Sequence, residues 1–272
     1  MNSAFKKINF TIKNQVATIS LNRPEVLNSF NYAMADEVID AFEICKKEDN
    51  VRAILLTGEG RAFCAGQDLA EATGENAPSI DKIVEHTYNP ILSAIRNTPK
   101  PVICAVNGVA AGAGANIAIA CDITIASESA KFIQSFTNIG LVPDSGGTYN
   151  LPRLIGMQNA AALMFSGDKL TAKEAKNLGL IYDLTEDENL MEVAFSYAEK
   201  LAKRPTKSIG LTKQLLNQSL NNNLNEQLEL EKEFQAISAQ SYDHKEGIKA
   251  FFEKRKPEYR GNWLFHQSFI EN

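Results

Sequence analysis

The stretch VICAVNGVAAGAGANIAIACDITIA, at residues 102–126, decides the fold. Its first five residues are an apolar run that predicts a buried strand, and its last five predict a second strand. Between them, glycines at positions 108, 112 and 114 indicate turns, and an apolar segment from about Ala115 predicts a short helix. Such alternation of strands with helices is typical of an α/β protein, so we predict an α/β core.

The sequence on both sides of this stretch continues the alternation to about residue 185. Asn14 and Gln15 separate two alternating apolar segments, which predicts a hairpin. The helical spacing of Met34, Val38 and Phe42 then predicts an amphipathic helix. We expect strands at Ile8–Lys13, Val16–Leu21 and residues 52–57, and helices at Tyr32–Lys47 and residues 83–95.

The remainder of the chain changes to helical patterns. Thr171 and Glu174 have the spacing of a capping box, in which each side chain satisfies a free backbone donor of the other residue. Pro205 precedes another periodic segment, as is common at the first turn of a helix. We predict helices at residues 192–203, 206–220, 224–237 and 248–254. The chain is accordingly divided into a core, residues 1–200, and a C-terminal helical region, residues 201–272.

The composition excludes several classes of protein. Lys and Arg number 28 against 33 Asp and Glu, and the resulting net charge of −5 argues against sequence-independent nucleic-acid binding. The chain has no apolar leader segment and no run of eighteen apolar residues, so we expect a soluble protein without a membrane span. The four cysteines lack Cys-x-x-Cys spacing. We therefore expect buried free thiols, no metal site and a cytoplasmic location.

A second stretch, FTNIGLVPDSGG at residues 136–147, isolates one carboxylate. Asp144 is its only ionisable side chain and is flanked by Val142, Pro143 and two glycines. Partial burial would raise the pKa of this carboxyl and make it a base near neutral pH. Alternatively, Asp144 caps a helix that begins near Gly146, because Asp is common at helix N-termini. The residues alone leave both interpretations open.

Two glycine-rich turns offer free backbone N–H groups. The first is FCAGQDL at residues 63–69, and the second is NGVAAGAG at residues 107–114. Backbone donors that converge from two separate turns are what an oxyanion hole requires. Glycines also permit positive φ and close packing, and for either turn alone this is the simpler explanation.

Two other motifs fit the sequence less well. Residues 112–117 lie between a strand and a helix like a dinucleotide fingerprint, but Ile117 replaces its third glycine. Ser145 beside two glycines resembles the active-site serine of chymotrypsin-like proteases. Those enzymes are all-β proteins with a partnered histidine, whereas the three histidines here lie in helical or terminal segments. We therefore set both motifs aside.

Six motifs that span almost the whole chain in order resemble the crotonase, or enoyl-CoA hydratase/isomerase, superfamily. The resemblance implies a spiral of ββα units with a C-terminal helical subdomain, and assembly into homotrimers or dimers of trimers. It also implies an acyl-CoA thioester substrate, so that coenzyme A enters as part of the substrate and no separate cofactor is expected. The motifs are LNRP at residues 21–24 with Asn28, FCAGQD at 63–68, AVNGVAAGAG at 105–114, ACDI at 120–123, Pro143 with Gly146 and Gly147, and FFEKR at 251–255.

The resemblance also assigns roles to particular positions. It places the oxyanion hole on the backbone N–H groups of Gln67 and Ala113, which would hold the thioester oxygen as it becomes an enolate. Contacts to the nucleotide end of coenzyme A would come from the first loop and from the end of the last helix. The substrate-binding positions implied are Arg23, Leu27, Ala65, Asp68, Leu69, Gly112, Asn116, Phe136, Lys254 and Arg255.

Departures from the family pattern indicate the reaction. Hydratases of this family carry two glutamates, and the matching positions here hold Asn116 and Phe136, neither of which transfers a proton as a carboxylate does. Asp144 matches the position at which isomerases and aryl-CoA dehalogenases of the superfamily carry a catalytic aspartate. One carboxylate suffices for a 1,3-proton shift. Asn116 would orient substrate or satisfy a helix end, and Phe136 would make the acyl pocket apolar and help to raise the pKa of Asp144.

Among the branches of the superfamily, the chain looks most like the 1,2-epoxyphenylacetyl-CoA isomerases of phenylacetate degradation, which convert an epoxide to an oxepin and shift double bonds in enoyl-CoA. The motifs that carry this likeness are residues 107–114, 141–144 and 254–261. A dehalogenase would need a tryptophan in the pocket, and the single tryptophan is Trp263 in the tail. The alternatives are a hydratase, a dehalogenase, and a non-catalytic assembly partner. A complex with a partner hydratase is also compatible with the resemblance.

Overall fold

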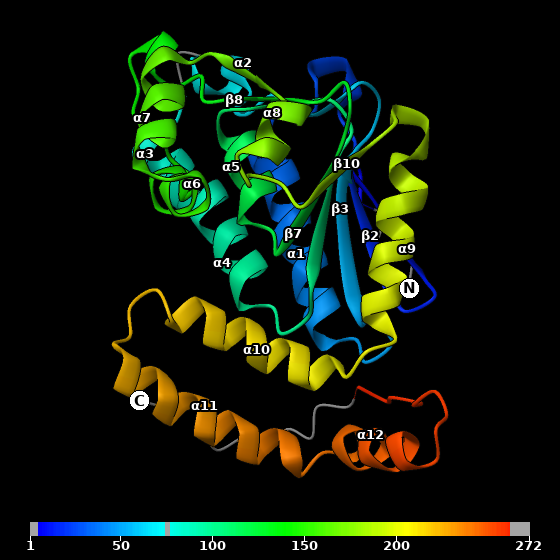
Figure 1. The fold of residues 1–272 in the computed structure, drawn as a ribbon. Coiled ribbons are helices and arrows are strands. Elements are labelled where there is room, and N and C mark those ends of the chain that lie inside the picture. The colour runs from blue at the N-terminus through cyan, green and yellow to red at the C-terminus, as the bar shows by residue number, and fades with distance from the viewer. Residues whose placement is uncertain (1–4, 74–76, 262–272) are drawn as a thin grey trace.

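The computed structural model describes residues 5–73 and 77–261, which form an α/β core followed by three C-terminal helices (Figure 1). Trp263, on which the argument against a dehalogenase rests, lies outside the described residues. All four cysteines are buried and free, as the sequence predicted. None of the helices in the described ranges has the length and apolar character needed to cross a membrane.

Two sheets make the core. The six-stranded sheet has the order β1-β2-β3-β5-β7-β10, with β1 antiparallel to β2 and every other pair parallel. The four-stranded sheet has the order β4-β6-β8-β9. The strands of the first sheet are β1 (Ile8–Lys13), β2 (Val16–Leu21), β3 (Ala53–Gly58), β5 (Val102–Val106), β7 (Ile123–Ser127) and β10 (Asp183–Thr185); those of the second are β4 (Ala62–Cys64), β6 (Val109–Ala111), β8 (Lys131–Ile133) and β9 (Lys169–Thr171).

From β3 to β8, successive strands alternate between the two sheets, which makes the fold a spiral. The chain passes from β3 to β4, from β5 to β6 and from β7 to β8, so each pair contributes one strand to each sheet. A helix follows the β5–β6 pair, α5 (Ala113–Ala120), which is buried along its whole length. The predicted crotonase-like arrangement of ββα units is confirmed.

The six-stranded sheet is covered on both faces. Along β3, Ala53 and Leu55 pack with α9 (Leu190–Ala202), whereas Ile54 and Leu56 belong to the core cluster that includes residues of α1 (Tyr32–Lys47) and α5. This alternation follows from the strand geometry, which points successive side chains to opposite faces. Figure 1 shows α9 on one side of the sheet and α1, α4 (Asn89–Asn97) and α5 on the other.

The predicted helix at residues 83–95 is broken into three parts. They are α3 (Ile80–Ile83), a π-helical turn at Val84–Tyr88, and α4. Pro90 lies in the first turn of α4. Proline has no N–H to donate and its ring clashes with the carbonyl four residues earlier, so the preceding turn widens.

Most short elements connect the two sheets or cover their ends. The capping box at Thr171 and Glu174 is present as predicted. The remaining elements of the core are α2 (Leu69–Ala72), α6 (Gly147–Ile155), α7 (Met157–Ser166), α8 (Ala172–Asn177), and the 3-10 turns at Pro24–Val26, Thr137–Ile139 and Asp187–Asn189.

The C-terminal region consists of α10 (Thr206–Gln218), α11 (Leu224–Ala239) and α12 (Tyr242–Phe252). The last helix begins six residues before the predicted start at 248, because Ser241 accepts a hydrogen bond from the N–H of His244 and caps it. Two buried cations attach the region to the core. Arg52 donates to the carbonyl of Tyr259 at 2.9 Å, and Lys213 of α10 pairs with Asp122 at 2.7 Å.

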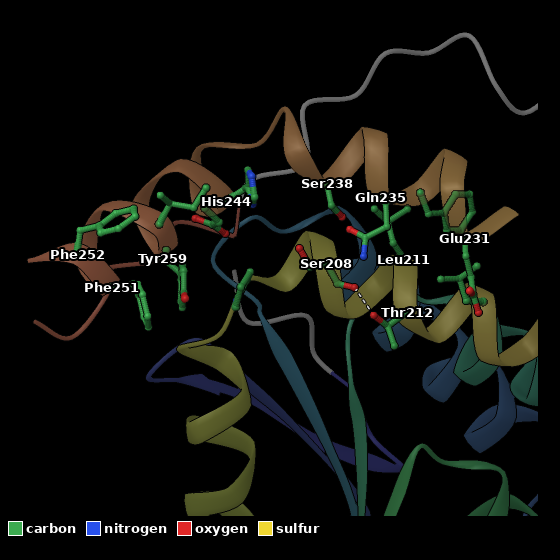
Figure 2. Close-up of a pocket in the computed structure, with 16 residues that line it drawn as sticks. Ser208, Leu211, Thr212, Glu231, Gln235, Ser238, His244, Phe251, Phe252 and Tyr259 are labelled. Carbon is green, nitrogen blue, oxygen red and sulfur yellow. Dashed lines mark hydrogen bonds between the residues drawn. The ribbon is translucent and has the colours of Figure 1, made fainter. Parts of the chain in front are cut away.

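A groove of about 850 Å³ opens between α10, α11 and α12. Figure 2 shows Leu211 and Thr212 of α10 with Gln235 and Ser238 of α11 along it. No residue of α11 is buried in the chain, and its Leu224 is 73% exposed. A role of residues 201–272 in trimer formation stays a prediction.

Candidate active site

The turn after β4 presents the backbone N–H of Gln67 away from its neighbours. On one side, Phe30 donates its N–H to the carbonyl of Gly66 at 2.7 Å, and Asp68 donates to the carbonyl of Phe30 at 2.8 Å. Successive N–H groups of an extended chain point in alternate directions, so the N–H of Gln67 points to the opposite side. Within residues 5–73 and 77–261, no backbone acceptor pairs with it.

The turn after β6 presents a second free donor. Gly112 adopts φ 53° and precedes Ala113, the first residue of α5. The first N–H groups of a helix have no partner within the helix, and the helix dipole makes this end electropositive. The carbonyl oxygen of a substrate placed there would accept from the Ala113 N–H.

Glycines allow the two turns to approach each other. A Cβ atom at Gly66 would lie 3.7 Å from the Ala113 nitrogen and 3.1 Å from the carbonyl oxygen of Ala111. A Cβ atom at Gly114 would lie only 2.4 Å from the carbonyl oxygen of Cys64. The packing interpretation of these glycines is therefore correct, and the packing itself brings the two donor turns together.

Asp144 lies in a tight turn before α6 and is partly buried. Burial raises the pKa of its carboxyl above the ordinary value, whereas the hydroxyl of Ser145, which donates to Oδ1 at 2.8 Å, acts in the opposite direction. The predicted direction of the pKa shift is confirmed. The alternative interpretation, that Asp144 caps the following helix, is wrong: Gly146 is the N-cap of α6, and no side chain caps this helix.

Asn116, on α5, holds the backbone of the Asp144 turn. Its side chain is fully buried, and Nδ2 donates to the carbonyl oxygen of Asp144 at 2.8 Å. Its Oδ1 accepts from Nε2 of Gln134 at 2.9 Å. Both ends of the amide are thus engaged by protein groups. Asn116 lies in the middle of α5, so its amide bonds to the Asp144 turn and to Gln134 and not to an end of its own helix.

Phe136 lies against the second donor turn. It is 7% exposed, and its ring edge would lie 3.8 Å from a Cβ atom at Gly112. A buried ring at this point gives the neighbourhood of the turn an apolar wall, as the sequence led us to expect.

Tyr88 is a residue of the site that the sequence did not reveal. Its hydroxyl donates to Oε1 of Gln67 at 2.7 Å, and the residue is 1% exposed. Burial raises the pKa of Tyr88 well above its ordinary value, and the charges of Cys64, Asp144 and Glu71 add to this. Asp144 therefore lies within electrostatic reach of the side chain that holds Gln67. The only sequence signal was Pro90, which widens the turn that carries Tyr88.

Two residues predicted to bind substrate pair with each other. Arg23 donates to Oδ2 of Asp68 at 2.7 Å and to the carbonyl of Ser29 at 2.7 Å. Asp68 also caps α2 through the N–H of Ala70. The pair links the first loop to the turn that carries Gln67. Because the two groups are of opposite charge and in contact, their charges neutralise each other.

The other predicted contacts are divided between two ends of the molecule. Leu27 accepts from the N–H of Ala65 at 3.0 Å, which places both beside the first donor turn, and Leu69 is 59% exposed next to them. Lys254 and Arg255 follow α12, at the opposite end from α2 (Figure 1). One chain does not bring these cations to the donor turns, and their role stays a prediction.

The site combines two backbone donors with one partly buried carboxyl. Two backbone donors point from adjacent turns, and a carboxyl with a raised pKa lies next to the helix that carries one of them. Among the described residues, no group of three or more His, Cys, Asp or Glu side chains is placed to hold a metal ion. The groups present are those of acid–base chemistry beside a stabilised oxyanion.

Comparisons with known proteins extend over nearly the whole chain. The model of the family described as Enoyl-CoA hydratase/isomerase matches residues 11–262. The chain is 45% identical to the 1,2-epoxyphenylacetyl-CoA isomerase of Escherichia coli (strain K12), covering 92% of this chain and 97% of that protein. It is 42% identical to the "Probable enoyl-CoA hydratase" of Rhodobacter capsulatus, covering 95% and 99%. The crystal structure of an enoyl-CoA hydratase from Bacillus anthracis superposes with a TM-score of 0.88 at 35% identity, covering 94% and 100%. Both isomerases and hydratases are thus similar to this chain.

Proposed function

Because the chain belongs to the enoyl-CoA hydratase/isomerase, or crotonase, family, we propose that it is an acyl-CoA isomerase in which Asp144 is the single acid–base group. The observation that carries the proposal is the pairing of this carboxyl, whose pKa burial raises, with Asn116 and Phe136 at the positions where a hydratase has glutamates. Water addition needs one group to activate water and another to protonate carbon. A proton shift needs one group used twice.

In the proposed reaction, the Asp144 carboxylate removes a proton from the carbon next to the thioester carbonyl. The electron pair of the broken C–H bond moves into the thioester, whose oxygen becomes an enolate and accepts from the N–H groups of Gln67 and Ala113. The protonated Asp144 then returns the proton two carbons away, and the carbonyl re-forms. A positioned base is worth about 10²–10⁴ in rate, and one oxyanion donor about 10²–10³.

For the substrate, we propose 1,2-epoxyphenylacetyl-CoA, converted to the oxepin, or an enoyl-CoA whose double bond is shifted. The first is supported by the 45% identity to the Escherichia coli isomerase of that name. The apolar ring of Phe136 beside the second donor turn supports an aromatic or unsaturated acyl group. Assembly into trimers or dimers of trimers, with or without a partner hydratase, is part of the same proposal, and the exposed Leu224 of α11 supports it.

The proposal is tested by incubating the protein with a 3-enoyl-CoA in D₂O. The assay follows the absorbance of the conjugated 2-enoyl thioester and the entry of deuterium. We expect the wild type to isomerise this substrate and Asp144→Asn to be about 10²–10⁴-fold slower, because the amide cannot take up the proton. Asp168→Asn, at an exposed aspartate away from the turns, is the matched control and should retain the wild-type rate.

Each alternative has its own outcome in this experiment. Equal rates for wild type and Asp144→Asn would contradict the assignment of the base. Rapid hydration of crotonyl-CoA by the wild type would favour a hydratase, and chloride release from 4-chlorobenzoyl-CoA would favour a dehalogenase. No turnover of any of these thioesters would favour a non-catalytic assembly partner.

A further inference from the structure

The position that carries a glutamate in hydratases has a different use in this chain. We infer that Asn116 is a positioning residue, which fixes the Asp144 turn relative to the oxyanion donor of Ala113, with Gln134 setting the orientation of its amide. The inference rests on the proposed function, because it concerns the placement of the proposed base.

Helix α5 carries both the proposed oxyanion donor, Ala113, and the side chain that holds the Asp144 turn, Asn116. Ala113 and Asn116 are three residues apart on α5, so their positions lie on the same face, about 4.5 Å apart along the axis. Every residue of α5 is buried, which holds the helix in place. Nδ2 of Asn116 donates to the carbonyl oxygen of Asp144. This hydrogen bond fixes the Asp144 turn to α5, the helix whose first N–H, that of Ala113, is the proposed oxyanion donor.

Gln134 determines which way the Asn116 amide points. Its Nε2 donates to Oδ1 of Asn116, so Nδ2 is the end left to face Asp144. The Gln134 side chain is buried, and its own Oε1 has no hydrogen-bond partner among the described residues. Leaving a buried acceptor unpaired costs free energy, whereas the Nε2 end of the same amide is paired with Asn116. Here the donated hydrogen bond keeps the Asn116 amide from flipping.

The absence of a side chain at Gly147 leaves room for the Asn116 amide. A Cβ atom at Gly147, the first residue of α6, would lie 2.3 Å from Nδ2, 2.7 Å from Cγ and 2.8 Å from Oδ1 of Asn116. A side chain at position 147 would therefore push the Asn116 amide away from the Asp144 carbonyl.

The test compares substitutions of two buried residues: Asn116, which lies on α5, and Thr124, which hydrogen-bonds to α5. Asn116→Asp keeps the shape but, when ionised, cannot donate to the Asp144 carbonyl. Thr124→Val is the matched control: it removes the 2.8 Å hydrogen bond from the Thr124 hydroxyl to the carbonyl of Ala118, also on α5, away from Asp144. The readouts are kcat and KM for a 3-enoyl-CoA, together with the melting temperature.

We expect kcat of Asn116→Asp to fall by about 10²-fold with KM unchanged, since a displacement of ~1 Å costs that much in a positioned reaction. Thr124→Val should lower the melting temperature and leave kcat unchanged. If Asn116→Asp does not fold, Gly147→Ala tests the same contact, because its methyl group drives the amide away from Asp144. In Gly147→Ala with Asn116→Ala, the melting temperature should recover relative to Gly147→Ala alone, while kcat stays low.

Failure of this inference differs from failure of the proposed function. If Asp144→Asn abolishes isomerisation but Asn116→Asp and Gly147→Ala retain the wild-type kcat, the positioning role of Asn116 is refuted. The assignment of Asp144 as the base is then unaffected. A fall in kcat of Thr124→Val as large as that of Asn116→Asp would show a general effect of loosening α5, which also refutes it. Wild-type turnover in Asp144→Asn would instead refute the function on which the inference depends.

Discussion

Gly114→Ala separates the two donor turns with a single methyl group. The added Cβ would lie 2.4 Å from the carbonyl oxygen of Cys64, 2.7 Å from its Cβ and 2.8 Å from its Sγ. Ordinary contacts begin at 3.4 Å, so relieving this clash requires α5 and β4 to move apart by about 1 Å. α5 begins with Ala113, and β4 leads into Gln67. The substitution therefore widens the gap between the two N–H groups without changing either.

A displacement of this size is expected to lower kcat/KM for a 3-enoyl-CoA by about 10²-fold. Overpacking should also cost about 1–3 kcal/mol in the free energy of unfolding, measured by urea titration. The control is Gly247→Ala in α12, where the closest atom to the new Cβ is the flexible Tyr259 hydroxyl at 3.3 Å. Alanine also favours the helix, so this variant should retain activity and stability. Folded Gly114→Ala with wild-type kcat/KM would refute the view that the two turns act together.

Four other expectations concern stability, pH, positioning and the attachment of the C-terminal region. Burial raises the folded-state pKa of Asp144 above its unfolded value, so ionisation of this carboxyl destabilises the fold as pH rises from the unfolded pKa through the folded one. Asp144→Asn should therefore have a higher melting temperature than wild type at neutral pH and the same melting temperature at low pH. A lower melting temperature of the variant at pH 7 would contradict this. The same raised pKa predicts that wild-type kcat/KM rises with pH and levels off above the ordinary aspartate range, which a pH profile without this acidic limb would exclude. Tyr88→Phe leaves Oε1 of Gln67 without its donor and should cost about 1–3 kcal/mol in unfolding, with lower kcat; unchanged values would show that the hydroxyl does not hold Gln67. Arg52→Met removes the donor to the Tyr259 carbonyl and should increase protease cleavage in the C-terminal region, an effect that equal digestion of both proteins would rule out.

Regular periodicity made the core predictable. The strand at Val102–Val106 and the helix at Tyr32–Lys47 have the predicted bounds, because the strand is a continuous apolar run and the helix buries one face at the helical period. The raised pKa of Asp144 was also foreseeable, since its neighbours in sequence are apolar or glycine. These features depend on local sequence or on one dominant pattern.

Contacts between distant segments were not predictable from the same patterns. The hydroxyl of Tyr88 donates to Gln67, 21 residues earlier in the chain, from a π-helical turn that no periodic pattern announced. Asn116 was considered for a helix end or for substrate, but its partner is a backbone carbonyl 28 residues away. The resemblance assigned Arg23 to substrate binding, and no pattern in the sequence indicated its pairing with Asp68. Such pairings are set by tertiary packing, which a single sequence does not encode as a period.

The central claim is that one carboxylate faces two backbone donors across the acyl group. A crystal structure with an unreactive acyl-CoA analogue tests it most directly. We expect the thioester oxygen to lie about 2.7–3.1 Å from the nitrogens of Gln67 and Ala113. An oxygen of Asp144 should then lie about 3–3.5 Å from the carbon next to the thioester. An acyl group bound with its carbonyl away from both N–H groups, or with Asp144 turned from that carbon, would contradict the account.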